Sequence, residues 1–164
     1  MRNNRIHKLT RLALVISFAL ILSYVESQLP PISAIAPGIK IGLANIAVIF
    51  VLYRFGIPEA ITVSIIRVII VAMLFGTPVS FFYSISGAVL SLAVMAILKK
   101  LTPLKEVAVS VTGGLMHNVG QILAAWVLLN DAVLYYLPIL MLSGTVAGIF
   151  VGIAAAILIK RVKL

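Results

Sequence analysis

The sequence VAVSVTGGLMHNVGQILAAWVLL, at positions 107–129, decides how the chain must fold. It is long enough to cross a bilayer, which takes about twenty mainly apolar residues, yet its centre carries His117, Asn118 and Gln121. In a helix these side chains share one side, because they are three and four residues apart. Unpaired polar groups in hydrocarbon are costly, so the cluster needs partners. It predicts either a ligand site or hydrogen bonds that hold neighbouring helices together.

The composition of the whole chain is that of a membrane protein. Of 164 residues, 63% are hydrophobic and 10% are charged, and the mean hydropathy is +1.24. A soluble domain with this composition would lack the polar groups to cover its surface. The net charge is +9, but the basic residues form short clusters between apolar runs, as membrane topology requires. We therefore expect an all-α integral membrane protein in contact with the lipid bilayer, with no nucleic acid partner.

The apolar runs predict six membrane helices in a single transmembrane domain over residues 1–164. They cover approximately 9–27, 39–53, 59–75, 79–98, 107–129 and 133–159. Three prolines and a glycine make residues 28–38 an irregular outer loop. We interpret the first apolar run as an uncleaved membrane helix rather than a signal peptide.

Charge then orients the predicted bundle, because six spans place both termini on one side. Eleven of the 13 basic residues fall on that side: Arg2, Arg5, Lys8, Arg11, Arg54, Lys99, Lys100, Lys105, Lys160, Arg161 and Lys163. By the positive-inside rule this side is cytoplasmic. We expect a multi-pass protein of the bacterial cytoplasmic membrane with both termini in the cytoplasm.

Arg67 is the costliest residue to insert, at about 3 kcal/mol near a helix centre. At about 1.5 Å per residue, Arg67 and His117 reach similar depths near the bilayer midplane. The four acidic residues fall near predicted helix ends, so no carboxylate is expected at that depth: Glu26, Glu59, Glu106 and Asp131. The guanidinium would then need backbone carbonyls, amide oxygens, water or an anionic ligand.

Two further polar residues belong to the same hypothesis. Lys40 and Asn45 lie on the predicted second helix towards the outer leaflet, directly after the irregular loop. Lys40 could instead extend to the membrane interface, as lysines near helix ends commonly do. The candidate ligand-binding residues under the 28–38 loop are therefore Lys40, Asn45, Arg67, His117, Asn118 and Gln121.

Catalysis is not predicted. The sequence contains no glycine-rich phosphate loop, no intramembrane pair of carboxylates and no aspartate-rich magnesium motif. His117 has no neighbouring acid or nucleophile in sequence, and one histidine with two amides is a weak set of metal ligands. We expect no catalytic residue, no metal site and no cofactor. The absence of cysteine excludes disulfides and thiolate chemistry.

Two stripes of small residues are candidate docking faces. Gly144, Gly148 and Gly152 recur every four residues on the sixth predicted helix, and Ala13 and Ser17 make a shorter stripe on the first. Small side chains allow helix backbones to approach closely in a membrane. Each stripe could pack inside the bundle or dock a partner membrane protein.

Three motifs resemble a known family over nearly the whole chain: PGIKIGLANI at 37–46, Arg67 with LFG at 74–76, and HNVGQ at 117–121. The family is labelled heptaprenyl diphosphate synthase component I, or Gx transporter. It is similar to the S components of energy-coupling-factor (ECF) vitamin transporters. That likeness implies a six-helix S-component-like bundle, a loop covering the ligand, and ECF transmembrane and ATPase subunits as partners. Ala13 and Ser17 match the expected docking stripe only in part.

These observations leave several functional hypotheses open. The leading one is the substrate-binding component of a transporter for a small anionic or amphipathic molecule. The alternative is a non-catalytic accessory subunit of heptaprenyl diphosphate synthase or of quinone- or flavin-linked metabolism, since the single Asp131 cannot supply clustered aspartates for magnesium. A third is a scaffold without a ligand. An ion-driven carrier is disfavoured, because no acid is expected in mid-membrane.

Overall fold

The computed structural model describes residues 2–28, 42–129 and 131–162. Within these ranges the chain is helical, with short turns and no strand. The elements, in order, are α1 (Arg2–Gln28), α2 (Asn45–Arg54), α3 (Ile57–Phe75), α4 (Pro78–Leu101), α5 (Glu106–Leu129), the 3-10 helix η2 (Asp131–Tyr136) and α6 (Leu137–Arg161). The prediction of an all-helical chain with six α-helices is confirmed for this part of the chain.

Several helix boundaries differ from the sequence prediction, and two of the differences have a local reason. Helix α2 begins at Asn45, because Gly42 has a φ of +77° and cannot continue a right-handed helix; the predicted start at position 39 lies outside the described residues. The last predicted helix is divided into η2 and α6. Pro138 occupies the first turn of α6, where the missing N–H of proline costs no hydrogen bond.

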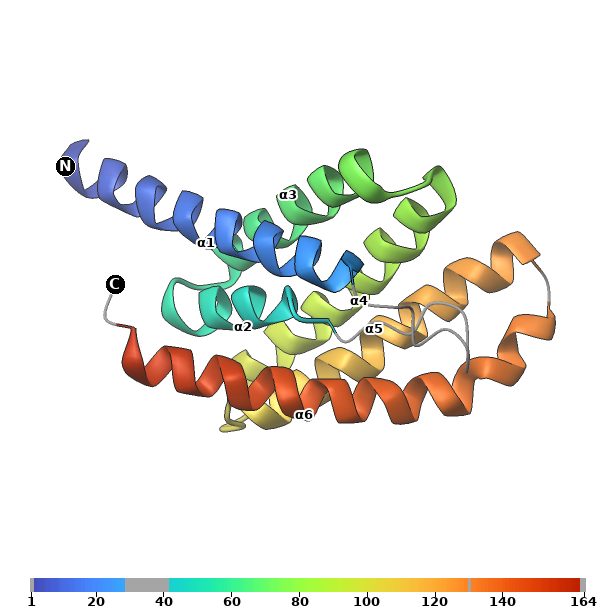
Figure 1. The fold of residues 1–164 in the computed structure, drawn as a ribbon. Coiled ribbons are helices and arrows are strands. Elements are labelled where there is room, and N and C mark those ends of the chain that lie inside the picture. The colour runs from blue at the N-terminus through green and yellow to red at the C-terminus, as the bar shows by residue number, and fades with distance from the viewer. Residues whose placement is uncertain (1, 29–41, 130, 163–164) are drawn as a thin grey trace.

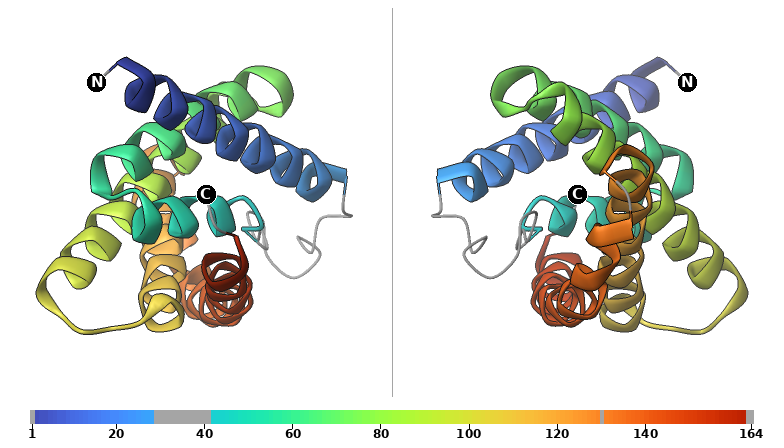
Figure 2. Two further views of the ribbon diagram at one scale, coloured as in Figure 1. Left: turned by 90° about the vertical axis from the view of Figure 1, so that its left-hand side faces the viewer. Right: turned by 90° about the vertical axis from the view of Figure 1, so that its right-hand side faces the viewer.

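Helix α2 lies in the interior of the bundle. Its residues from Ile46 to Leu52 are all buried, and they pack with α1, α3 and α6. Helices α4, α5 and α6 pack in sequence order on one side, whereas α1 and α3 lie together on the other (Figures 1 and 2). Apolar residues all round the short α2 are what such a central position requires.

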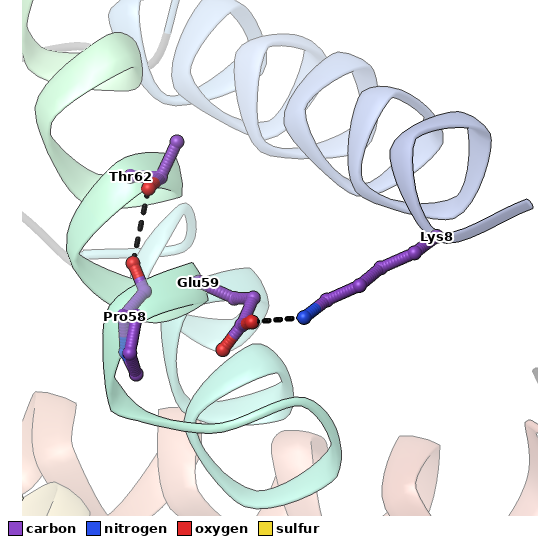
Figure 3. Close-up of polar contacts among 4 residues, drawn as sticks. All are labelled: Lys8, Pro58, Glu59 and Thr62. Atoms are coloured by element: carbon purple, nitrogen blue, oxygen red, sulfur yellow. Dashed lines mark hydrogen bonds and ion pairs between the residues drawn. The ribbon is translucent and has the colours of Figure 1, made fainter. Parts of the chain in front are cut away.

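Helices α1 and α3 lie side by side and run in the same direction. Near their amino ends the Lys8 ammonium pairs with the Glu59 carboxylate (Figure 3). Near their carboxyl ends the Tyr24 and Phe75 rings contact each other, with centroids 5.7 Å apart. Both pairs join residues 51 positions apart in the chain, so the two helices keep one register along their contact.

Both chain termini lie at one end of the bundle (Figure 1). Basic side chains there donate hydrogen bonds to backbone carbonyls in or just after the last turns of helices. Lys99 donates to the carbonyl of Leu52 in the last turn of α2, and Arg54 donates to the carbonyl of Val162 at 2.7 Å. Carbonyls in the last turn of a helix have no partner within it, and cations there also suit the helix dipole. Part of the basic cluster that orients the predicted topology is therefore also structural.

Four segments are long and apolar enough to cross a membrane: Ile6–Gln28, Ile57–Phe75, Pro78–Leu101 and Asp131–Arg161. Large apolar side chains also face outward, such as Met73 and Val127, which are 81% and 82% exposed. Such exposure fits contact with lipid rather than water. These features indicate a multi-pass membrane protein. Helix α5 is equally long, but the polar residues between 112 and 121 lower its apolar character, and the described α2 has only 10 residues.

Candidate functional site

Arg67 lies midway along α3, a helix whose buried residues are otherwise small or apolar. Its Nε atom is buried and has no hydrogen-bond partner among the residues that the structure describes. A buried donor that is left unsatisfied carries its full desolvation cost, and the cost is greater for a charged group. The prediction that Arg67 needs a hydrogen-bond partner beyond its own helix therefore applies to a specific atom, the Nε.

Glu26 lies in the last turn of α1, and α1 packs directly on α3, the helix of Arg67. The expectation that no carboxylate lies at the depth of Arg67 stays a prediction. The Glu26 carboxylate and the Arg67 guanidinium form no ion pair within 4 Å in the described structure.

Glu26 also joins α1 to the start of α2. Its Oε1 accepts a hydrogen bond of 2.5 Å from the backbone N–H of Gly42. This places a negative charge at the amino end of α2, where unpaired N–H groups and the helix dipole favour it. Sequence reasoning missed this role. The sequence did contain a signal for it: an acidic residue ends the first predicted helix, and glycines occur at the start of the second predicted helix.

Asn45 belongs to the same neighbourhood. Its backbone N–H donates to the Gly42 carbonyl at 2.8 Å. Its side chain also lies beside Gly42, since a Cβ atom added to this glycine would be 3.2 Å from the Asn45 Nδ2. We call Glu26, Gly42, Asn45 and Arg67 the Arg67 cluster; these residues lie on or directly before α1, α2 and α3, three helices that pack on one another. Lys40, the other predicted ligand residue of this region, lies outside the described residues.

The polar residues of α5 contact other helices. Asn118 donates through Nδ2 to the carbonyl of Leu140 on α6. The His117 ring lies against Gly87 on α4, where an added Cβ would be 2.9 Å from the ring. Gln121 is half-buried one turn further along. Helix α5 packs on α4 and α2, two helices that also contact α3, so a joint site of these α5 residues with Arg67 stays a prediction.

The two small-residue stripes lie in different surroundings. A Cβ atom added to Gly144, Gly148 or Gly152 would lie 2.6–2.8 Å from atoms of α5. This stripe therefore packs inside the bundle and does not form a free docking face. Ala13 and Ser17 are exposed on α1, and the Ser17 hydroxyl bonds the Ala13 carbonyl of its own helix at 3.0 Å. Only the α1 stripe is therefore open to a partner in this chain.

In the described ranges, no three His, Cys, Asp or Glu side chains gather around one point. The arrangement around Arg67 offers instead an arginine donor, a carboxylate acceptor and an amide, close to apolar helix surfaces. Such a set can bind the polar end of a small molecule by hydrogen bonds and charge.

Comparison with known proteins places the chain in a family. The family model described as heptaprenyl diphosphate synthase component I matches residues 15–158. No curated protein and no solved structure matches significantly. The matched range contains all of α2 to α5, most of α1 and α6, and every residue of the Arg67 cluster. The chain therefore belongs to the heptaprenyl diphosphate synthase component I family.

Proposed function

We propose that this protein is a substrate-binding membrane component that captures a small molecule at the Arg67 cluster for a transporter. The observation that carries the proposal is the buried Nε of Arg67, which lies within an apolar helix and has no hydrogen-bond partner in the described part of the chain. A bound acceptor would satisfy this donor, and its interaction would be strong because the surroundings have a low dielectric constant. Lys40, His117, Asn118 and Gln121 remain predicted ligand residues, of which Asn118 already bonds within the bundle.

The proposal includes six membrane spans with both termini in the cytoplasm, as in S components of ECF transporters. Both chain ends lie at the same end of the bundle, as an even number of spans requires (Figure 1). The basic residues gathered there agree with the positive-inside rule. In this arrangement α2 and α5 supply the two spans beyond the four most apolar ones.

Transport would need energy from elsewhere, because the sequence contains no nucleotide-binding loop. We assign the docking of an ECF-type transmembrane subunit, with its ATPase subunits, to the exposed side of α1 around Ala13 and Ser17. Small side chains on an exposed membrane helix allow a partner helix to approach closely.

The test is to purify the tagged chain from its own membranes and identify released small molecules by mass spectrometry. Wild-type protein and the control Arg11→Leu, which removes an exposed arginine, should release the same compound. Arg67→Leu should remain folded, because it removes an unsatisfied donor, and should release none. Recovery of equal amounts from Arg67→Leu would refute the proposed site.

The family description supports a second candidate, a non-catalytic membrane subunit that assembles with other subunits of a heptaprenyl diphosphate synthase. With Asp131 as its single aspartate, the chain cannot itself hold magnesium in the way that prenyl elongation requires. The test is to add the purified chain, in lipid, to a soluble aspartate-rich synthase subunit. An unchanged reaction rate and product length would exclude this role.

A further inference from the structure

Three consecutive residues at the carboxyl end of α2 each hold a different segment of the chain: Leu52, Tyr53 and Arg54. The Leu52 carbonyl accepts a hydrogen bond from Lys99 in the last turn of α4. The Tyr53 hydroxyl donates to the carbonyl of Leu104, in the turn between α4 and α5, at 3.1 Å. The Arg54 guanidinium donates to the carbonyl of Val162, directly after α6, at 2.7 Å. The ends of α4 and α6 and the α4–α5 turn are therefore fixed around one helix end.

Each segment held in this way carries a basic residue next to the one that α2 contacts: Lys100, Lys105 and Arg161. We call these three residues the basic triad. All three are exposed, and none of them has a hydrogen bond or an ion pair with another residue in the ranges that the structure describes. The contacts with α2 fix the backbone beside each residue of the triad, while the charged ends of its side chains stay available to a ligand.

Acidic residues do not balance the positive charge of this region. The described segments 52–54, 99–106 and 160–162 contain six basic residues and one acidic residue, Glu106. Glu59 pairs with Lys8 on the other side of the bundle, where α1 and α3 lie (Figures 2 and 3). Lys163, which lies outside the described residues, is also basic. The region around the triad therefore attracts anions.

The outward faces of α4 and α6 indicate which kind of anion fits. Val89 and Ile97 share a face of α4 with Lys100, and Phe150 and Ile157 share a face of α6 with Arg161, because these spacings are close to whole helical turns. The four apolar side chains are between 49% and 66% exposed. Each face is thus apolar up to its last turn and basic at its end. A membrane phospholipid has the matching profile, with acyl chains that end at a charged headgroup.

We propose that the basic triad binds the headgroup phosphate of an anionic phospholipid whose acyl chains lie along the outward faces of α4 and α6. Lysine and arginine side chains donate strong, charge-assisted hydrogen bonds to phosphate oxygens. This lipid site is separate from the Arg67 cluster and does not depend on the proposed capture of a substrate.

The experiment is native mass spectrometry of the full-length protein in detergent, titrated with short-chain phosphatidylglycerol. Phosphatidylcholine with the same chains tests the need for a net negative charge, and glycerol phosphate tests binding without acyl chains. The protein is compared with a triad variant (Lys100→Gln, Lys105→Gln and Arg161→Gln together), with Glu106→Gln, and with a control variant (Arg2→Gln, Arg5→Gln and Arg11→Gln together). The control removes the same number of positive charges from α1, which does not belong to the α4–α6 side of the bundle.

We expect the triad variant to bind phosphatidylglycerol at least about tenfold more weakly than wild type, since each basic residue near an anionic lipid surface contributes about fivefold. The control variant should stay within about twofold of wild type, because its charges lie away from the site. Glu106→Gln should bind about threefold more tightly, because it removes the acid beside Lys105. Phosphatidylcholine and glycerol phosphate should each bind wild type at least about tenfold more weakly than phosphatidylglycerol does.

Equal losses in the triad and control variants would overturn the proposal, because net charge rather than this site would then attract the lipid. Glycerol phosphate that binds as tightly as phosphatidylglycerol would overturn the assignment to a lipid and favour a free phosphate compound. A wild-type protein that does not prefer phosphatidylglycerol to phosphatidylcholine would also overturn it, and would favour an acidic protein surface as the occupant. If the triad variant does not fold, Glu106→Gln decides: tighter binding supports the proposal, and unchanged binding overturns it.

Discussion

Replacing Gly148 tests a close contact between the backbones of α5 and α6. A Cβ at this position would lie 2.7 Å from the Val111 Cα and 2.9 Å from the Ser110 carbonyl oxygen, both backbone atoms of α5. Ordinary contacts begin near 3.4 Å, so α5 and α6 would have to separate by about 0.7 Å. A gap of that size loses about a quarter to a half of each dispersion contact along the interface. It would also stretch the 2.7 Å hydrogen bond from the Ser110 hydroxyl to the Gly148 carbonyl.

We expect Gly148→Leu to lower the free energy of unfolding by about 3 kcal/mol, the upper part of the usual range for overpacking. Gly148→Ala should cost less, about 1 kcal/mol net, because alanine regains about 1 kcal/mol of helix propensity. The control Val146→Leu enlarges a side chain that is 47% exposed on the same helix, and should change stability by less than about 0.5 kcal/mol.

The assay is reversible unfolding in mixed micelles with increasing SDS, followed by circular dichroism. A graded loss in the order Val146→Leu, Gly148→Ala, Gly148→Leu would support the close approach of α5 and α6. If Gly148→Leu is as stable as wild type, the two backbones are not in contact at this position and the packing described for α5 and α6 is incorrect.

Three other substitutions test contacts elsewhere in the bundle, all by the same unfolding assay. Asn118→Ala should lower stability by about 1 kcal/mol, because it removes a hydrogen bond between α5 and α6; no loss would mean that the amide does not link these helices. Lys99→Met should lower the unfolding midpoint more than Lys100→Met, since Lys99 bonds the end of α2 and Lys100 is exposed; equal effects would contradict this. A double-mutant cycle with Lys8→Met and Glu59→Gln should give a coupling energy below about 1 kcal/mol that falls with added salt, as for exposed ion pairs. A larger coupling that salt does not change would contradict it.

Much of the fold could be predicted from the sequence, because length and apolar runs determine where membrane helices form. Helix α5 was placed within one residue at its start, and α3 ends at the predicted residue. The missed details depend on backbone geometry. The positive φ of Gly42 delays the start of α2, and a 3-10 segment precedes Leu137 in the last helix. Neither feature changes the apolar pattern from which the helices were predicted.

The candidate site was harder to predict, because it depends on which helices are neighbours. Depth along the membrane suggested that Arg67 and His117 could meet, and this stays a prediction, because α3 and α5 both pack on α2 and α4 but form no large interface with each other. Equal depth in the membrane specifies the position of a residue along the membrane normal but not its position within the membrane plane. Glu26 was placed at a helix end and therefore left out of the site, although its carboxylate accepts a hydrogen bond from the Gly42 N–H just before α2. Sequence spacing within one helix was informative, whereas contacts between helices required the structure.

The shared direction of α1 and α3 has a consequence for how the protein is made. Two neighbouring membrane helices that run the same way cannot be joined by a short turn, so α2 must be synthesised between them. Helix α1 therefore waits in the lipid during synthesis until residues 57–75 have left the ribosome, and only then can Lys8 pair with Glu59 and Tyr24 meet Phe75. A nascent chain halted before position 57 should expose to lipid the side of α1 that later packs on α3, and chemical crosslinking from that side to lipid should stop once α3 has been inserted.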